Sequence, residues 1–191
     1  YSAGKRSLLE KEVLAFLVSG GTTEAVLVHP EENRRFSVRL VASSLDLKAG
    51  QAIDRVGGLL GLPFPAGLAL ERLALTSGAS FRIHPSMKGA DCSLSGIQNQ
   101  CEAMVKKGAG KEDVALYCLL SVWAALDAMT AALLEQYGDL PVLFAGGVMS
   151  NSILKHRLSE RYGAFFADPA FSADNAAGVA VLAALSEGGE P

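Results

Sequence analysis

The sequence predicts an α/β fold whose sheet has an antiparallel hairpin edge. Three extended segments come first, at Val13–Val18, Thr23–Val28 and Arg35–Ala42, and segments with helical periodicity follow them. Strands followed by a run of helices are typical of an α/β unit. The later stretch Pro141–Ala145 is continuously apolar, which favours a parallel strand covered on both faces. We therefore expect a sheet with helices packed against it.

The composition indicates a globular protein with one substantial core. The 191 residues are 50% hydrophobic and carry a formal net charge of −3, whereas a dedicated nucleic-acid-binding protein is usually basic. No apolar run reaches the ~18 residues of a membrane span, so we expect no membrane partner. The three cysteines lack CxxC spacing, and reduced thiols in a cytoplasmic protein are the simplest interpretation. We expect residues 1–191 to form a single domain.

The first hairpin is bent around a Ser-Gly-Gly turn at residues 19–21. Glycines allow positive φ angles and let a ligand approach the backbone amides closely. A hairpin turn needs no ligand, and on this feature alone a plain turn is the better interpretation. However, a second glycine pair, Gly146-Gly147, also follows an apolar strand. Two such loops recur in folds that hold a nucleotide between paired hairpins.

Apolar residues at helical spacing predict the helices. The expected helices, in chain order, are Gly50–Leu60, a short helix that opens at Ala66 or Gly67, Ile97–Lys107, Glu112–Tyr137, about Ser150–Tyr162, and Asn175–Glu187. Two prolines in residues 62–67 separate the first two helices. We expect residues 76–90 to be a loop and residues 164–167 to be one more short strand.

Three polar residues at helix starts have both a structural and a functional interpretation. Asn151 follows the second glycine pair, where exposed amides favour an anion and its side chain can bond to a sugar or phosphate; Ser150 or Asn151 can equally cap the helix. Asp174 fits an N-cap or a metal ligand. Asp54 is either solvated or functional.

Nucleophilic and metal chemistry have weaker signals. Ser19 and Ser95 are conceivable nucleophiles, but no histidine and acid support a triad, and the motif G-x-S-x-G is absent. The three histidines have no i, i+4 spacing, so we expect each of them on the surface and no complete metal site in this chain.

Five segments, in order, resemble the motifs of one family. FLVSGGTTEAVLV resembles its VSGG(H)T hairpin, AIDRVGGLLGLPFPAG its FDK-x₃-LLGL-x-YPGG segment, CSLSGI its FSFSGLK stretch, AGGVMSN its AGGV-x-AN motif, and FSADNAAGVA its TDNxAM helix. The family is that of the tRNA threonylcarbamoyladenosine transferase subunit of the TsaD/Gcp type, historically called an O-sialoglycoprotein endopeptidase. The resemblance implies a ribonuclease-H-like half of an acetate kinase/Hsp70/actin (ASKHA) fold, with a ligand between two halves.

The resemblance also implies roles for matching residues. Leu17, Val18, Ser19, Gly20 and Gly21 would bind the adenylate. Asp54 and Gly67 would contact its ribose or phosphate, and Glu71, four residues after Gly67, would belong to the same nucleotide-binding set. Gly146, Gly147 and Asn151 would also contact the adenylate, which is ATP, AMP or threonylcarbamoyl-AMP. Asp174 would be the third ligand of one divalent metal, iron or zinc, whose two histidines stand in an HxxxH motif upstream of the hairpin in the family. This chain begins where that motif ends, so we expect it to be the carboxy-terminal half of a longer protein.

The implied activity is transfer of threonylcarbamoyl from its AMP adduct to N6 of a tRNA adenosine, and we expect this chain alone to be inactive. Departures from the family pattern at Thr22, Gln51, Ala66 and Gln98 leave a second interpretation open, a non-catalytic paralogue that pairs with a related subunit. An ASKHA phosphotransferase and a metallopeptidase are less favoured. The implied partners are other subunits of the modification machinery and, through them, tRNA; a homodimer is the other assembly considered.

Overall fold

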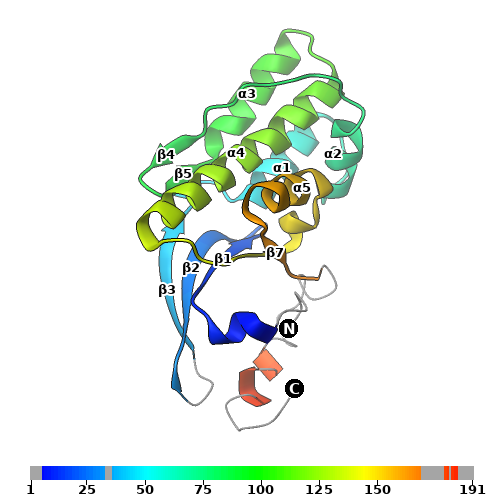
Figure 1. Ribbon diagram of the computed structural model, residues 1–191. Helices are drawn as coiled ribbons and strands as arrows, with labels where there is room; N and C mark the ends of the chain where they lie inside the picture. Colours follow the sequence, from blue (N-terminus) through cyan, green and yellow to red (C-terminus); the bar gives the residue numbers. More distant parts are fainter. Residues whose placement is uncertain (1–5, 33–35, 169–178, 181, 185–191) are drawn as a thin grey trace.

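The computed structural model describes residues 6–32, 36–168, 179–180 and 182–184, and its centre is a five-stranded sheet (Figure 1). The strand order is β3-β2-β1-β6-β7. The strands are β1 Val13–Val18, β2 Thr23–Pro30, β3 Phe36–Ser43, β6 Val142–Ala145 and β7 Phe165–Phe166. The predicted hairpin and third strand are confirmed, because β1, β2 and β3 form an antiparallel meander. The predicted parallel strand is also confirmed: β6 pairs in parallel with both β1 and β7.

The α-helices that lie between β3 and β7 in the chain are on one side of this sheet in Figure 1. They are α1 Ala49–Leu59, α2 Gly67–Ala74, α3 Ser95–Lys106, α4 Lys111–Tyr137 and α5 Ser152–Tyr162. Short 3₁₀ helices, η1 Arg6–Glu10 and η3 Gly147–Ser150, precede β1 and α5. The helices agree with the predicted ones to within two residues at most ends. The last predicted helix, 175–187, lies mostly outside the described residues.

The core lies between the sheet and the helices. Alternate residues of β1 point into it, and the Phe16 ring stacks on Phe144 of β6 at 4.7 Å between centroids. Helix α4 lies against this core and has buried residues around most of its circumference. Among the described residues, α4 alone is long and apolar enough to span a membrane, but 67% of its most apolar window is buried inside the fold. We therefore assign α4 as the core helix.

Three predictions differ from the structure. The expected loop 76–90 contains strand β4, Ser86–Lys88, which pairs with β5, Asp91–Ser93; its sequence is too short for a period to show. The expected helix at Ser150 begins at Ser152, because the 3₁₀ turn intervenes. On the edge strand β3, alternation predicts one apolar face of Phe36, Val38 and Leu40. Among the described residues this face is open to solvent: Val38 is 62% and Leu40 57% exposed.

Asp46, which the sequence did not single out, anchors the SLSG segment. Its carboxylate accepts hydrogen bonds from the Leu94 N–H at 2.7 Å and the Ser95 hydroxyl at 2.6 Å. Burial acts to raise the pKa of Asp46, but hydrogen bonds from the Ser95 hydroxyl and from backbone N–H groups outweigh it and lower the pKa below its usual value. Ser95 is therefore a partner of Asp46 that begins α3, and no histidine lies in its bonding network.

Candidate functional site

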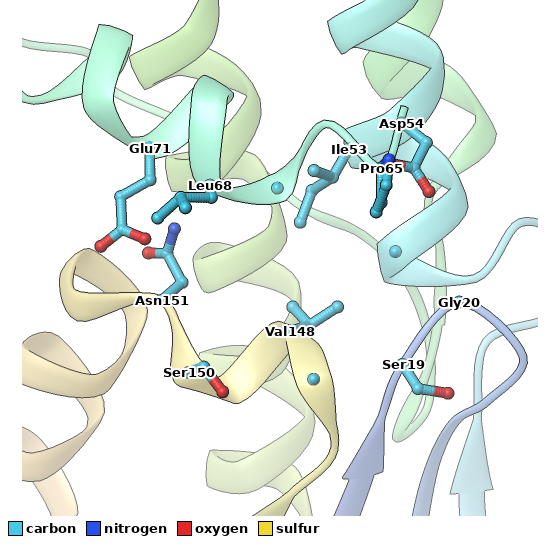
Figure 2. Close-up of a pocket in the computed structure, with 13 residues that line it drawn as sticks. Ser19, Gly20, Ile53, Asp54, Pro65, Leu68, Glu71, Val148, Ser150 and Asn151 are labelled. Carbon is cyan, nitrogen blue, oxygen red and sulfur yellow. The ribbon is translucent and has the colours of Figure 1, made fainter. Parts of the chain in front are cut away.

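A cleft of about 370 Å³ opens where the loops after β1 and β6 meet α1 and α2 (Figure 2). Its lining residues are Ser19, Gly20, Gly50, Ile53, Asp54, Pro65, Gly67, Leu68, Glu71, Gly147, Val148, Ser150 and Asn151. In Figure 2 the α1 and α2 side chains lie on one side, and the Ser19–Gly20 turn and the loop after β6 lie on the other. The structure thus brings together segments that are more than 100 residues apart in the sequence.

The Ser19 side chain stabilises its own turn. Its hydroxyl oxygen accepts hydrogen bonds from the Gly21 N–H at 3.1 Å and the Thr22 N–H at 3.0 Å. The Ser19 N–H in turn donates to the Thr22 carbonyl at 2.8 Å. Local bonds of this kind are the usual reason for a serine at a turn. They organise the backbone that lines the cleft and leave no base beside the hydroxyl, so the structure offers no support for Ser19 as a nucleophile.

The glycines around the cleft fall into two groups. At Gly50, Gly57 and Gly146 a Cβ atom would collide with other parts of the chain, at 2.7 Å from Gly20, 2.1 Å from Ala66 and 2.2 Å from Val18. Gly50 and Gly57 therefore allow α1 to pack closely against two neighbouring loops, and Gly146 allows close packing against the end of β1. At the cleft-lining positions Gly20, Gly67 and Gly147 a Cβ atom would meet nothing within 4 Å. The second group has room for a ligand beside the backbone.

Asp54 ties the proline-rich loop to α1. Its carboxylate Oδ1 accepts the Ala66 N–H at 2.7 Å, and Ala66 packs directly against Gly57 of the same helix. The two contacts place Pro65 and Gly67 at the rim of the cleft. Asp54 is half-buried and lines the cleft, so it is a loop anchor whose other carboxylate oxygen has no bond to the described residues.

The amino terminus of α5 is capped by side chains from this chain. Asn151 Oδ1 accepts the Ile153 and Leu154 N–H groups, both at 3.1 Å. Glu71 of α2 accepts the Ser152 N–H at 2.7 Å and also the Ser152 hydroxyl. The first-turn amides that the sequence suggested for an anion are thus already bonded, and the capping interpretation of Asn151 is confirmed. Figure 2 shows the Asn151 amide nitrogen on the side of Leu68 and Glu71. The hydrogen bonds of this side chain to the described residues are made by its oxygen.

Free backbone donors occur one turn earlier. Within the described residues, the N–H groups of Gly20, Gly147 and Val148 have no hydrogen-bond acceptor, and all three residues line the cleft. Backbone N–H groups at two facing loops can hold an anion without a charged side chain. The loop before α5, rather than the helix itself, supplies the donors on that side.

Not every predicted binding residue lines the cleft. Leu17 and Val18 belong to β1; the Val18 side chain is in the core, and Leu17 is 41% exposed on the opposite face of the sheet. Gly21 and Gly146 also lie outside the lining, and Gly146 serves the contact with Val18. Asp174 lies outside the described residues.

The described residues do not provide a metal centre. They contain no group of three or more histidine, cysteine, aspartate or glutamate side chains that could hold an ion. The histidines are exposed, as predicted: His29 pairs with Glu12 at 3.5 Å, and His156 with Glu160 at 3.4 Å. The described part of the chain therefore does not fit the metal that the family resemblance implies.

The cysteines are buried and free, as predicted. Burial raises the pKa of the Cys92 thiol to about 11, and contact with Cys101 together with burial raises the pKa of Cys118 well above its usual value. Protonated buried thiols are poor nucleophiles, so these side chains belong to the core.

Several cleft residues were not identified from the sequence. Leu68 is one of the apolar positions that predict the short helix α2, but it is 62% exposed at the cleft rim. Ile53 and Val148 also line the cleft, and in Figure 2 their side chains face it from opposite walls. An apolar residue at a helix start has the same pattern whether it lines a pocket or a core, so only its position next to the glycine loops could have indicated this role.

The sheet order, the layer formed by α1 to α5 and the cleft between two glycine loops define half of an ASKHA-type fold. The phosphate- and nucleotide-bound structure of HypF superposes with a TM-score of 0.70 at 14% identity, over 86% of this chain and 38% of HypF. The ADPNP-bound activator of the 2-hydroxyisocaproyl-CoA dehydratase from Clostridium difficile gives a TM-score of 0.55 at 13% identity, over 93% of this chain and 62% of that one. These likenesses establish the fold.

Sequence comparison establishes the family. A model of the TsaD family, tRNA N6-adenosine threonylcarbamoyltransferase, matches residues 4–181. A relative of that description from Pelodictyon phaeoclathratiforme is 31% identical over 92% of this chain and 56% of its own length. A probable bifunctional tRNA threonylcarbamoyladenosine biosynthesis protein from Thermoplasma volcanium is 33% identical over 82% of this chain and 29% of its own length. The chain belongs to the tRNA N6-adenosine threonylcarbamoyltransferase family. It spans about half the length of the relatives described as threonylcarbamoyltransferases and less of the bifunctional protein.

Proposed function

We propose that this chain is the adenylate-binding, carboxy-terminal half of a tRNA N6-threonylcarbamoyladenosine transferase. The observation that carries the proposal is the cleft, which Gly20, Gly147 and Val148 line from two loops. Within the described residues their backbone N–H groups have no acceptor. Such donors suit the phosphate of an adenylate. The apolar side chains of Ile53, Leu68 and Val148 suit a purine base, because ligand sites combine apolar walls with a few placed polar groups.

The proposed reaction needs binding and orientation from these residues. The adenosine N6 of tRNA attacks the carbamoyl carbon of threonylcarbamoyl-AMP, the carbon–oxygen bond to the phosphate breaks, and AMP leaves while N6 loses a proton. Negative charge develops on the carbonyl oxygen and on the departing phosphate. Fixed backbone donors at these positions stabilise that charge. The described residues offer no donor set for a metal, so no step is assigned to one here.

Three departures from the family pattern bear on the alternative of a non-catalytic paralogue. Gln51, Ala66 and Gln98 all lie outside the lining of the cleft. Gln98 bonds Glu102 at 2.9 Å, and Ala66 is buried against α1. Because these changes leave the cleft itself intact, we favour the transferase half. We further propose a cytoplasmic protein that works with other subunits of the modification machinery and receives tRNA through them.

The test is nucleotide binding by the purified chain, measured by thermal shift and titration calorimetry with AMP and ATP. Ligand binding stabilises by RT ln(1 + [L]/Kd), about 1.4 kcal/mol near ten times Kd. We expect the melting temperature to rise at millimolar nucleotide, by less than in a longer protein that contains the other half of the fold. Gly147→Ala should fold normally, because the added methyl meets nothing within 4 Å, yet it should weaken binding because the methyl enters the cleft.

The matched control is Gly78→Ala, a loop glycine that also has open space around it and does not line the cleft. It should bind nucleotide as the unmodified chain does. Absence of any shift with millimolar AMP and ATP would overturn the adenylate proposal. Equal nucleotide affinity in Gly147→Ala and Gly78→Ala would place the ligand elsewhere.

A further inference from the structure

We propose that Thr23 is a positioning residue that fixes the two walls of the cleft relative to each other. The walls are the Ser19–Thr22 turn and the first two turns of α1. Thr23 itself is fully buried and does not line the cleft, so it acts through the groups that it holds. The inference rests on the nucleotide-binding function proposed above.

Both hydrogen-bonding functions of the Thr23 hydroxyl are used, one toward each wall. Its oxygen Oγ1 accepts the Ala49 N–H at 2.8 Å, across 26 residues of sequence. The same hydroxyl donates to the Thr22 carbonyl oxygen at 2.8 Å. That carbonyl also accepts the Ser19 N–H at 2.8 Å and so closes the glycine turn. A single hydroxyl therefore connects the turn to the start of the helix.

Helix α1 depends on this connection, because the side chain of its own N-cap residue cannot accept a hydrogen bond from the first N–H groups of the helix. The first N–H groups of a helix have no partner within the helix and usually bond to a side chain at the N-cap. Here the N-cap residue is Lys48, whose side chain has no acceptor. Thr23 takes the Ala49 N–H instead, and the Ser19 carbonyl takes the Gly50 N–H at 3.0 Å. The hairpin thus caps the helix from outside.

The cap sets the cleft geometry because the lining residues lie immediately beyond it. Gly50, Ile53 and Asp54 of α1 all line the cleft, within five residues of the bonded Ala49. The start of α1 and the glycine turn are in direct contact, since a Cβ atom on Gly50 would lie 2.7 Å from the Gly20 Cα. Loss of the Thr23 hydroxyl would therefore change the position of Gly20 relative to Asp54 and Ile53.

The experiment compares Thr23→Val, which keeps the shape but removes the hydroxyl, with Thr23→Ser, which keeps the hydroxyl. We expect Thr23→Val to weaken AMP binding per folded molecule about tenfold, as for loss of a buried hydrogen bond, and Thr23→Ser to restore it. The matched control is Thr130→Val. Thr130 is equally buried and bonds the Leu126 carbonyl at 2.7 Å within α4, so this variant should lose stability without any change in affinity for AMP.

Amide hydrogen exchange gives a readout that does not depend on nucleotide. In the unmodified chain the Ala49 and Gly50 amides should be protected, although first-turn amides of a helix are normally open to solvent. Thr23→Val should make both amides exchange faster, and Thr130→Val should leave the exchange of both amides unchanged. If the unmodified chain binds no nucleotide, the proposed function fails while exchange still tests Thr23. Rapid exchange at Ala49 in the unmodified chain, or unchanged AMP affinity in folded Thr23→Val, would overturn the role of Thr23.

Discussion

Gly146, directly after β6, lies against the backbone of Val18 at the end of β1, so closely that a Cβ atom would be 2.2 Å from the Val18 carbonyl oxygen. Its φ angle is +105°, a region that other residues rarely adopt. The neighbouring Gly147 has open space instead. Two adjacent glycines thus have different roles: the first brings the two loops together, and the second leaves room between them.

The Gly146 contact predicts that Gly146→Ala destabilises the chain while Gly147→Ala does not. The positive φ angle and the collision with Val18 should cost at least about 2 kcal/mol, or roughly 5 °C in Tm for a domain of this size. Thermal unfolding followed by circular dichroism measures the difference. Equal melting temperatures for the two variants would show that the loops are not in contact at Gly146.

A second prediction separates the two roles of Asn151. Asn151→Asp keeps an oxygen that caps α5, and a negative charge is favourable at a helix amino terminus, so the melting temperature should be unchanged or higher. The substitution removes the amide donor and places a carboxylate beside the proposed phosphate site, so stabilisation by AMP should be lost. Asn151→Ala should lose both the helix cap and the stabilisation by AMP. The missing cap should lower the stability by about 1 kcal/mol.

The control for Asn151→Asp is Asn99→Asp, which adds the same charge at an exposed position of α3. This variant should have the same melting temperature as the unmodified chain, and AMP should raise that temperature by the same amount. Retained AMP binding in Asn151→Asp would mean that the side chain is a cap alone.

A third prediction concerns the acid stability that Asp46 provides. Its pKa is lower in the folded chain than the usual 3.8, so its contribution is complete above that pH and is lost as the pH falls through the folded-state value. Asp46→Asn should therefore be less stable than the unmodified chain at pH 7, and the difference should shrink below about pH 4. Urea unfolding at several pH values measures it, with the exposed Asp139→Asn as the control. A difference that is independent of pH would rule out the carboxylate as its source.

A fourth prediction concerns metal content. Asp174 lies outside the described residues, and the described residues hold no cluster that could complete a site with it. One carboxylate is too few donors for iron or zinc, which take several protein ligands. We expect only trace metal in the purified chain after dialysis, measured by atomic emission. Near-stoichiometric iron or zinc that is lost in Asp174→Ala would show that the chain completes a metal site by itself.

The strands and long helices could be predicted because their signals are local. The apolar runs on either side of the Ser-Gly-Gly turn predicted the hairpin, and the continuous apolar run of β6 predicted a parallel strand; both predictions hold in the structure. Of the residues predicted to bind the adenylate, Ser19, Gly20, Asp54, Gly67, Glu71, Gly147 and Asn151 line one cleft in the structure; their roles in binding stay predictions. That these residues lie close together could be expected from the order of the family motifs. Their individual hydrogen bonds could not. Glu71, for example, is bonded to Ser152, 81 residues away.

The sequence by itself determined the α/β class, the positions of the two glycine loops and the family, because residue type, spacing and motif order are properties of the chain alone. Only the tertiary structure decided which glycines face a neighbouring backbone and which face open space, and that Thr23 caps a helix 26 residues further on. The physical reason is that a glycine or a hydroxyl has the same local signature in either role. Its partner is selected by packing between distant segments, which no local pattern encodes.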